Sequence, residues 1–273
     1  MSAPFIFQLI SLGRGGVASC VQCERAASAV SREPYPAEDI LAALAGLPAE
    51  AHDVAFGGFE PFAHPELPRL IAAAVERSGG AGRLLLQTDG GALAGGGNAE
   101  GAVLAGARVF EIPYHAGDEN VDDKMTGRPG LAHARRAGIS TLRHVAAEHP
   151  EAHVMVCAVA KLCRHGGRGA ALTGIAQAAV RDGLDALRIE AQPGAVPDAA
   201  QVASAAEILV PAGIWLFGDG CESLLDGAAP YQFDPDPSLS LRGAQSVTRQ
   251  SSDGNDSQVG QDFSLQTDQE PLS

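Results

Sequence analysis

The feature that most constrains this chain is an unbroken alternation of short apolar runs with segments of helical periodicity. The apolar runs predict strands at residues 5–12, 53–56, 83–87, 108–114, 152–160, 186–190 and 213–217. The segments between them predict helices at 36–47, 65–77, 100–104, 131–148, 172–182 and 199–209. Strands that alternate with helices pair in parallel and are joined by right-handed crossovers. The predicted fold class is therefore α/β with a parallel sheet.

Periodicity alone leaves two arrangements open for this sheet. It can close as a full or partial (β/α) barrel, or it can lie open and doubly wound. In both arrangements the functional residues lie in loops that follow the carboxyl ends of the strands. Three such loops carry chemistry-bearing or glycine-rich sequences, namely those with Cys20 and Cys23, with Gly57-Gly58, and with Thr88-Asp89-Gly90.

Charge and cysteine content exclude several classes of protein. The formal net charge of -14 argues against a nonspecific nucleic-acid surface and against binding to anionic membranes. The five cysteines are an odd number at uneven spacings, unlike a secreted disulfide framework. The amino-terminal residues lack the basic region of a signal peptide, and no apolar run is long enough to span a membrane. We expect a soluble cytoplasmic protein.

The composition changes near residue 233. Ser, Gln, Asp and Gly dominate the remaining chain, and apolar residues become sparse. Such a segment buries too little apolar surface to offset the entropy lost on ordering. We therefore predict a folded α/β domain over residues 1–232, which the resemblance described below makes a barrel, and a disordered, low-complexity tail over residues 233–273.

Cys20 and Cys23 lie in a glycine-rich loop after the first predicted strand. Two thiols at this spacing suit a metal, a cluster or redox chemistry. A structural zinc site needs four ligands, and the chain has no second Cys-x-x-Cys pair. The same loop contains Gly13-x-Gly15-x-x-Ala18, which fits a dinucleotide-binding turn. These interpretations remain open at this stage.

The order of the motifs resembles the radical SAM superfamily. After the cysteine loop come Gly57-Gly58-Phe59-Glu60-Pro61 and His64-Pro65-Glu66-Leu67. The segment 86–93 contains Thr88-Asp89-Gly90, which is similar to the threonine–asparagine–glycine turn of that family. Segments 109–114 and 125–130 are similar to its fourth strand and the following loop. The resemblance extends from about Phe5 to Phe217 and implies a partial (β/α)6 TIM-like barrel.

In that family a C-x-x-x-C-x-x-C motif holds a [4Fe–4S] cluster through three thiolates. The open iron position binds the amino and carboxylate groups of S-adenosylmethionine, whose reductive cleavage yields a 5′-deoxyadenosyl radical. The resemblance makes Cys20 and Cys23 the second and third cluster ligands. Gly16 stands at the position of the first cysteine and offers no side-chain ligand.

The glycine at position 16 leaves three outcomes. Cys221, after the last predicted strand, could supply the third thiolate. The cluster could be labile or absent. The barrel could also serve another purpose, such as binding a peptide or a partner enzyme.

The resemblance also assigns the S-adenosylmethionine contacts. Gly57, Gly58, Glu60 and Pro61 match the glycine-rich turn that contacts the amino group, where open backbone carbonyls accept from an ammonium. Thr88, Asp89 and Gly90 are expected to shape a turn. Other polar residues follow the fourth and fifth predicted strands and are candidates for the barrel mouth: His115, Asp118, Lys161, Arg164, His165 and Arg168.

Three functional hypotheses follow. The first is a radical SAM enzyme with a small-molecule or peptide substrate. The second is a catalytically inactive barrel of the same type that binds a protein partner or peptide. The third is a nucleotide-dependent enzyme that uses Gly13 to Ala18. No residue is assigned a catalytic role by the sequence.

Overall fold

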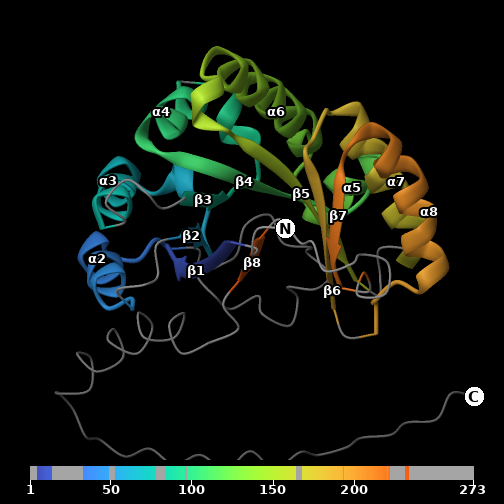
Figure 1. Ribbon diagram of the computed structural model, residues 1–273, viewed down its shortest axis with the longest axis horizontal. Helices are drawn as coiled ribbons and strands as arrows, with labels where there is room; N and C mark the ends of the chain where they lie inside the picture. The colour runs from blue at the N-terminus through green and yellow to red at the C-terminus, as the bar shows by residue number, and fades with distance from the viewer. Residues whose placement is uncertain are drawn as a thin grey trace, which may run out of the picture.

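The computed structural model of the chain describes residues 5–13, 33–48, 53–77, 84–95, 97–163, 168–192, 194–219, 221 and 231–233. Within these residues the strands form one parallel sheet in the order β7-β6-β5-β4-β3-β2-β1-β8 (Figure 1). The strands are β1 (Phe5–Ser11), β2 (Val54–Gly57), β3 (Leu84–Gln87), β4 (Ala107–Tyr114), β5 (Met155–Leu162), β6 (Ala186–Ala191), β7 (Trp215–Gly218) and β8 (Tyr231–Phe233).

Helices follow the strands and cover one face of the curved sheet. Figure 1 shows α2, α3, α4, α6, α7 and α8 as an outer layer around the strands. The helices are α2 (Ala37–Ala45), α3 (Leu67–Arg77), α4 (Asn98–Ala105), α5 (Glu119–Thr126), α6 (Leu131–Glu148), α7 (Arg168–Arg181) and α8 (Ala199–Leu209). Short 3-10 turns are η1 (Pro61–Ala63), η2 (Gly91–Ala94), η3 (Pro150–Ala152) and η4 (Val210–Ala212).

The sheet has two different faces because successive side chains of a strand point in opposite directions. The outer face packs against the helices and forms the main core, in which Phe110 of β4 is fully buried. The inner face carries a smaller apolar cluster built from strand residues. Its buried members are Phe7, Ala55, Leu85, Val109, Cys157, Ala186 and Phe217. A concave inner face closed at its floor by apolar side chains is typical of (β/α) barrels.

The pairing of the last strand shows how far the barrel closes. β8 pairs in parallel with β1, through Phe5–Tyr231 and Phe7–Phe233. In the described residues β7 pairs with β6 and is the last strand on its side of the sheet. The sheet is therefore a partial barrel with its seam between β7 and β8. The predicted α/β partial barrel with parallel strands is confirmed.

The same strand order decides between the two arrangements that periodicity left open. A doubly wound sheet reverses its strand order at the dinucleotide site and carries helices on both faces. Here β1 to β7 lie in chain order, and the helices of the main core pack on one face. Gly13 also has a structural reason to be glycine, since a Cβ there would lie 2.4 Å from the carbonyl oxygen of Glu33. The fold therefore does not support the dinucleotide interpretation.

Most predicted elements are present, with two instructive differences. The predicted strand 152–160 is shifted to Met155–Leu162, because Pro150–Ala152 form a 3-10 turn and His153 follows with a φ of 48°. Helix α5 was not predicted, because its polar sequence lacks an apolar stripe. Its end signals are nevertheless present: Asp118 caps the first turn through Val121 N, and Gly127 ends the helix with a φ of 66°.

Two expectations concern segments outside the described residues. The predicted tail lies there from residue 234 onward, while Phe233 belongs to β8. The loop of residues 14–32, with Gly16, Cys20 and Cys23, also lies there. Within the described part of the chain, no helix has the length and apolar character needed to cross a membrane.

Candidate functional site

The two ends of the cysteine loop meet at the carboxyl end of β1. Gly13, the last described residue before the loop, forms an antiparallel bridge with Pro34, just after it. Tyr35 N also donates to the carbonyl oxygen of Leu12 at 2.8 Å. The loop that carries Cys20 and Cys23 therefore leaves and rejoins the fold at the edge of the sheet where (β/α) barrels hold their sites.

The glycine turn after β2 contacts the base of that loop. Gly58 has a φ of 72°, in the left-handed region that glycine tolerates. A Cβ at Gly58 would lie 2.1 Å from Ser11 Oγ and 3.3 Å from the carbonyl oxygen of Gly13. The carbonyl of Gly57 accepts from Leu12 N at 2.8 Å, so one of its two lone pairs is used within the sheet.

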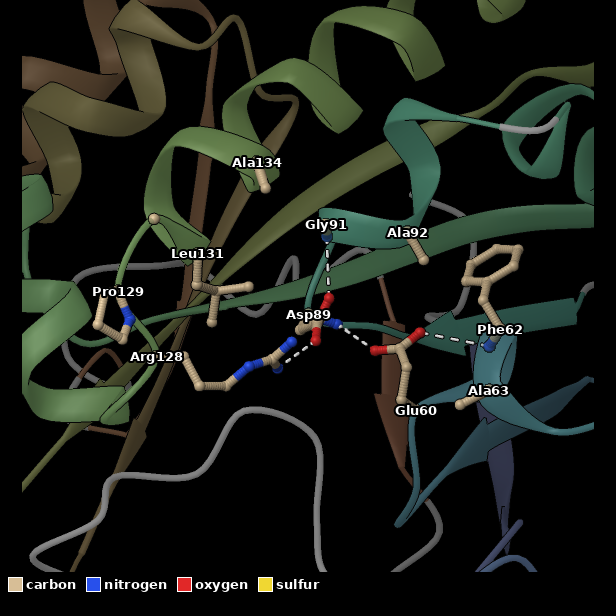
Figure 2. A pocket seen from close by; sticks show the side chains of 11 residues that line it. Glu60, Phe62, Ala63, Asp89, Gly91, Ala92, Arg128, Pro129, Leu131 and Ala134 are labelled. Carbon is tan, nitrogen blue, oxygen red and sulfur yellow. Dashed lines mark hydrogen bonds and ion pairs between the residues drawn. The ribbon is translucent and has the colours of Figure 1, made fainter.

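The carboxylate of Glu60 ties this turn to the next loop (Figure 2). Glu60 Oε1 accepts from Thr88 Oγ1 at 2.8 Å and from Phe62 N at 3.3 Å. Glu60 Oε2 accepts from Asp89 N at 2.7 Å. Pro61 is buried and begins η1, where the missing N–H of proline is not needed. Glu60 thus joins the loop after β2 to the loop after β3.

Asp89 extends the connection to the loop before α6. Its Oδ1 accepts from Gly91 N at 2.9 Å, and its Oδ2 forms an ion pair with Arg128. Figure 2 shows Asp89 between Arg128 and Glu60. Gly90 adopts a φ of 83°, and its N–H donates to Thr88 Oγ1 at 3.1 Å, which confirms the predicted turn. We call Glu60, Thr88, Asp89 and Arg128 the loop cluster.

A pocket of about 390 Å³ opens beside the loop cluster. Its polar lining comes from Glu60, Asp89 and Arg128, and its apolar lining includes Phe62 and Leu131. The remaining lining residues are Ala63, Gly91, Ala92, Pro129, Gly130 and Ala134. Two carboxylates and one guanidinium at an apolar wall suit a small ligand that carries both charges.

Burial, together with the smaller effect of the nearby Asp89 charge, raises the pKa of Glu60 from 4.5 to about 7. Three donated hydrogen bonds, from Asp89 N, Thr88 Oγ1 and Phe62 N, oppose this shift because they favour the carboxylate. Glu60 therefore gains or loses its proton near neutral pH.

A second polar cluster lies on the inner face of the sheet. Glu111 of β4 accepts from Gln87 Nε2 at 2.9 Å and from Arg188 Nε and Nη2 at 2.6 and 3.1 Å. Arg188 Nη2 also donates to Glu190 Oε2 at 3.1 Å, and Glu190 forms an ion pair with Lys161. We call Gln87, Glu111, Arg188, Glu190 and Lys161 the interior ladder.

The interior ladder starts at the apolar floor and runs toward the carboxyl ends of the strands. Glu111 and Cys157 are register partners, and Cys157 belongs to the floor. Lys161 and Glu190 are register partners further along β5 and β6. Burial alone would raise the pKa of Glu190, but the charges of Lys161 and Arg188 outweigh it and lower the pKa below its ordinary value.

The other mouth candidates have local partners. The side chain of Asp118 caps α5, accepting from Val121 N at 3.0 Å. His115 is buried, and its backbone N–H donates to Asp122 Oδ1 at 2.7 Å. Arg164 and His165 lie outside the described residues, and Arg168 begins α7. Lys161 is the basic residue of this group whose side chain is described, and its contacts place it in the interior ladder.

The three described cysteines lie in separate environments. Cys157 is in the apolar floor, Cys163 packs with Ala116 and Met125, and Cys221 is buried in the main core. In the part of the chain that the structure describes, no group of three or more His, Cys, Asp or Glu side chains is arranged to hold a metal ion. Cys221 as a third cluster ligand stays a prediction, as do Cys20 and Cys23.

Sequence analysis missed Arg128, Glu111, Arg188 and Glu190. A signal for the last three was present, since a charged residue inside an apolar run, at a position facing the inside of a barrel, is unusual. Glu111 falls in the predicted strand 108–114, and Arg188 and Glu190 fall two residues apart in 186–190. Arg128 lies in a loop and not in an apolar run, so no local pattern marks it, and only the fold brings it beside Asp89.

Neither a known protein family nor a curated protein matches the sequence. Solved structures do match. Streptococcus suis SuiB aligns at a TM-score of 0.51 and 14% identity, over 84% of this chain and 54% of SuiB. The structure of methylornithine synthase (PylB) aligns at a TM-score of 0.52 and 14% sequence identity, over 90% of this chain and 82% of PylB. The chain shares their fold.

SuiB has been solved in two bound states that match similarly. With S-adenosylmethionine the TM-score is 0.51 at 14% identity, over 80% of this chain and 51% of SuiB. With the precursor peptide SuiA bound, the TM-score is 0.53 at 13% sequence identity, over 78% of this chain and 49% of SuiB. The chain thus spans about half the length of SuiB. At these identities the likeness concerns the fold alone.

Proposed function

We propose that this chain is a radical SAM-type protein that binds a [4Fe–4S] cluster and S-adenosylmethionine and acts on a substrate yet to be identified. The observation that carries the proposal is the contact between two loops. The base of the cysteine loop, at Gly13, lies against Gly58 of the turn that the family resemblance assigns to S-adenosylmethionine. The fold shared with S-adenosylmethionine-bound SuiB supports it.

The residues of the pocket fit the amino acid end of S-adenosylmethionine. That end carries an ammonium and a carboxylate, and the pocket has Glu60 and Asp89 for the first and Arg128 for the second. Phe62 and Leu131 offer apolar contact for the carbon chain. A Cβ on Gly57 would lie 2.0 Å from Gln87 Oε1, and one on Gly58 would lie 2.1 Å from Ser11 Oγ, so these glycines let the turn beside the pocket pack closely against β3 and the end of β1.

The cluster site is less complete. Cys20 and Cys23 would supply two thiolates, and Gly16 leaves the third position to another donor, for which Cys221 is our candidate. A cluster bound here supplies the electron that cleaves S-adenosylmethionine reductively to a 5′-deoxyadenosyl radical. The residues of this chain bind and orient that cofactor and hold its amino acid end.

The glycine at position 16 favours a second candidate function. Without a third ligand the barrel would be catalytically inactive and would serve as a partner- or peptide-binding protein. That SuiB, of similar fold, has been solved with its precursor peptide bound supports this candidate. The two candidates differ in whether iron binds at all.

Anaerobic reconstitution with iron and sulfide separates them. The catalytic proposal expects a coloured protein with bound iron, and 5′-deoxyadenosine when S-adenosylmethionine and a reductant are added. Gly16→Cys should raise the iron content if position 16 is the lost ligand. Gly15→Cys is the matched control, because it adds a thiol to the same loop at the wrong spacing. A wild-type protein that binds no iron and does not cleave S-adenosylmethionine would contradict the catalytic proposal and favour the partner- or peptide-binding barrel.

The third ligand has its own test. Cys221→Ala should abolish cluster binding if Cys221 completes the site, whereas Cys157→Ala should keep it. Both thiols are buried, at 3% and 0% exposure, so the two variants remove comparable packing. Equal iron content in Cys221→Ala and Cys157→Ala would show that Cys221 is not a cluster ligand.

A further inference from the structure

The interior ladder is a chain of alternating charges with one buried end and one open end. From the floor outward its charged members are Glu111, Arg188, Glu190 and Lys161. The side chains of Glu111 and Arg188 are 1% and 14% exposed. Those of Lys161 and Glu190 are 32% and 43% exposed. The ladder therefore presents Lys161 and Glu190 to solvent and hides the members behind them.

The buried end is a firm support. Glu111 receives two hydrogen bonds from Arg188 and one from Gln87, so each of its carboxylate oxygens has a partner. Arg188 in turn holds Glu190 through Nη2. Replacing such a buried pair by apolar residues is often neutral or stabilising, so stability alone does not explain its presence. The Glu111–Arg188 pair instead fixes the direction of the Glu190 side chain, through the hydrogen bond from Arg188 Nη2.

The ion pair at the open end of the ladder, between Lys161 and Glu190, can be exchanged for contacts with a ligand at little cost. A partly exposed ion pair such as Lys161–Glu190 contributes about 0–1 kcal/mol. A ligand that offers each partner an opposite charge replaces the pair with little loss. Register partners on adjacent parallel strands lie about 4.8 Å apart, so a ligand must carry its two charges close together to meet both.

We propose that Lys161 and Glu190 bind the zwitterionic head of a free amino acid. Lys161 receives its carboxylate, and Glu190, positioned by Arg188, receives its ammonium. The four charges of the ladder sum to zero, which suits a zwitterion. A phosphate-bearing ligand instead needs an excess of cations.

This inference rests on the proposed function in one respect, namely that the bound amino acid is the substrate of the proposed radical SAM reaction. The interior ladder and the loop cluster both lie toward the carboxyl ends of the strands, where barrel enzymes bind their substrates. Binding itself needs neither iron nor S-adenosylmethionine. It can therefore fail or succeed independently of the reconstitution experiment.

The experiment is calorimetry on the full chain, purified without cluster, with the proteinogenic L-amino acids as probes. For the strongest binder, the methyl ester removes the carboxylate charge and the N-acetyl derivative removes the ammonium charge. Each derivative should bind about twofold to fivefold more weakly, as the loss of one partly exposed charged contact implies.

Crossed variants assign each charge to its residue. Lys161→Met should bind the free acid and the methyl ester equally, because the group that distinguishes them is gone. Glu190→Gln should likewise lose discrimination against the N-acetyl derivative alone. Lys161→Gln stands in if Lys161→Met does not fold. Glu38→Gln is the control, since it removes an exposed ion pair, with Arg69, from the outer surface.

Three outcomes would overturn the inference. One is that no amino acid in the panel binds. Another is that both variants discriminate as the wild type does. The third is that Arg128→Ala, in the pocket of the loop cluster, loses amino acid binding while Lys161→Met keeps it. In that case the amino acid occupies the pocket assigned to S-adenosylmethionine.

Discussion

The loop cluster and the interior ladder are both polar, but they are held in different ways. In the loop cluster, carboxylates accept mostly from backbone N–H groups, those of Phe62, Asp89 and Gly91. In the interior ladder, every hydrogen bond described above joins two side chains, projected from β3, β4, β5 and β6. Both clusters include buried carboxylates.

The difference separates two tasks. A carboxylate bound to backbone N–H groups sets the path of the chain, so the loop cluster shapes the turns around the pocket as well as lining it. Side chains on rigid strands leave the backbone unchanged when they exchange partners, so the interior ladder is suited to meet a ligand. Four substitutions test this comparison.

The largest expected effect is at the buried end of the interior ladder. Glu111→Leu leaves Arg188 without its bidentate partner and should lower the free energy of unfolding by about 3 kcal/mol. Glu111→Leu combined with Arg188→Met should recover more than half of that loss, because no buried charge is left unpaired. Urea unfolding measures both. A double variant as unstable as the single one would contradict our account of the ladder.

The loop cluster should be most sensitive at its backbone. Gly58→Ala introduces a Cβ at a left-handed φ and against Ser11 Oγ, and should cost about 2–3 kcal/mol and weaken S-adenosylmethionine binding. Gly97→Ala is the matched control: its φ is also 72°, but nothing lies within 4 Å of the added Cβ. It should cost about 1 kcal/mol. Equal losses would show that the contact with Ser11 is unimportant.

Glu60→Gln tests the electrostatics of the loop cluster. The folded pKa of about 7 exceeds the ordinary value of 4.5, so the folded state holds the proton more tightly than the unfolded chain. The contribution of Glu60 to stability is therefore full below pH 4.5 and is lost as the pH rises through 7. Wild type should lose on the order of 1–3 kcal/mol from this group across that window.

Thermal unfolding at a series of pH values measures this dependence. Glu60→Gln should flatten the curve between pH 4.5 and 7, the window set by Glu60. Glu38→Gln controls for the loss of one carboxylate elsewhere. An unchanged slope in Glu60→Gln would mean that Glu60 is not the titrating group.

The smallest effect is expected at the open end of the interior ladder. Glu190→Gln should change the free energy of unfolding by less than about 1 kcal/mol, as is usual for a partly exposed ion pair. Its effect should also shrink in high salt, unlike that of Glu111→Leu. A loss as large as that of Glu111→Leu would mean that the ladder has no open end.

Local patterns predicted the helices better than the site. Helix α6 has the bounds expected from its periodicity and from Pro150, because both signals are local. The loop cluster was only half anticipated: Glu60 and Asp89 were singled out, but not their connection or Arg128. Their hydrogen bonds and ion pair join residues 29 and 39 positions apart, and no local pattern encodes such a pairing.

The sequence by itself determined the α/β class, the parallel pairing of the strands and the glycine-rich loops after β2 and β3, because periodicity and turn residues act over a few positions. Periodicity left open whether the sheet closes; the family resemblance predicted a partial barrel, and the tertiary structure confirmed it, with the helices of the main core on one face. The tertiary structure also brought the base of the cysteine loop against Gly58 and aligned Glu111, Arg188, Glu190 and Lys161 into one ladder. Those outcomes depend on strand register and curvature, which arise from packing between residues distant in the chain.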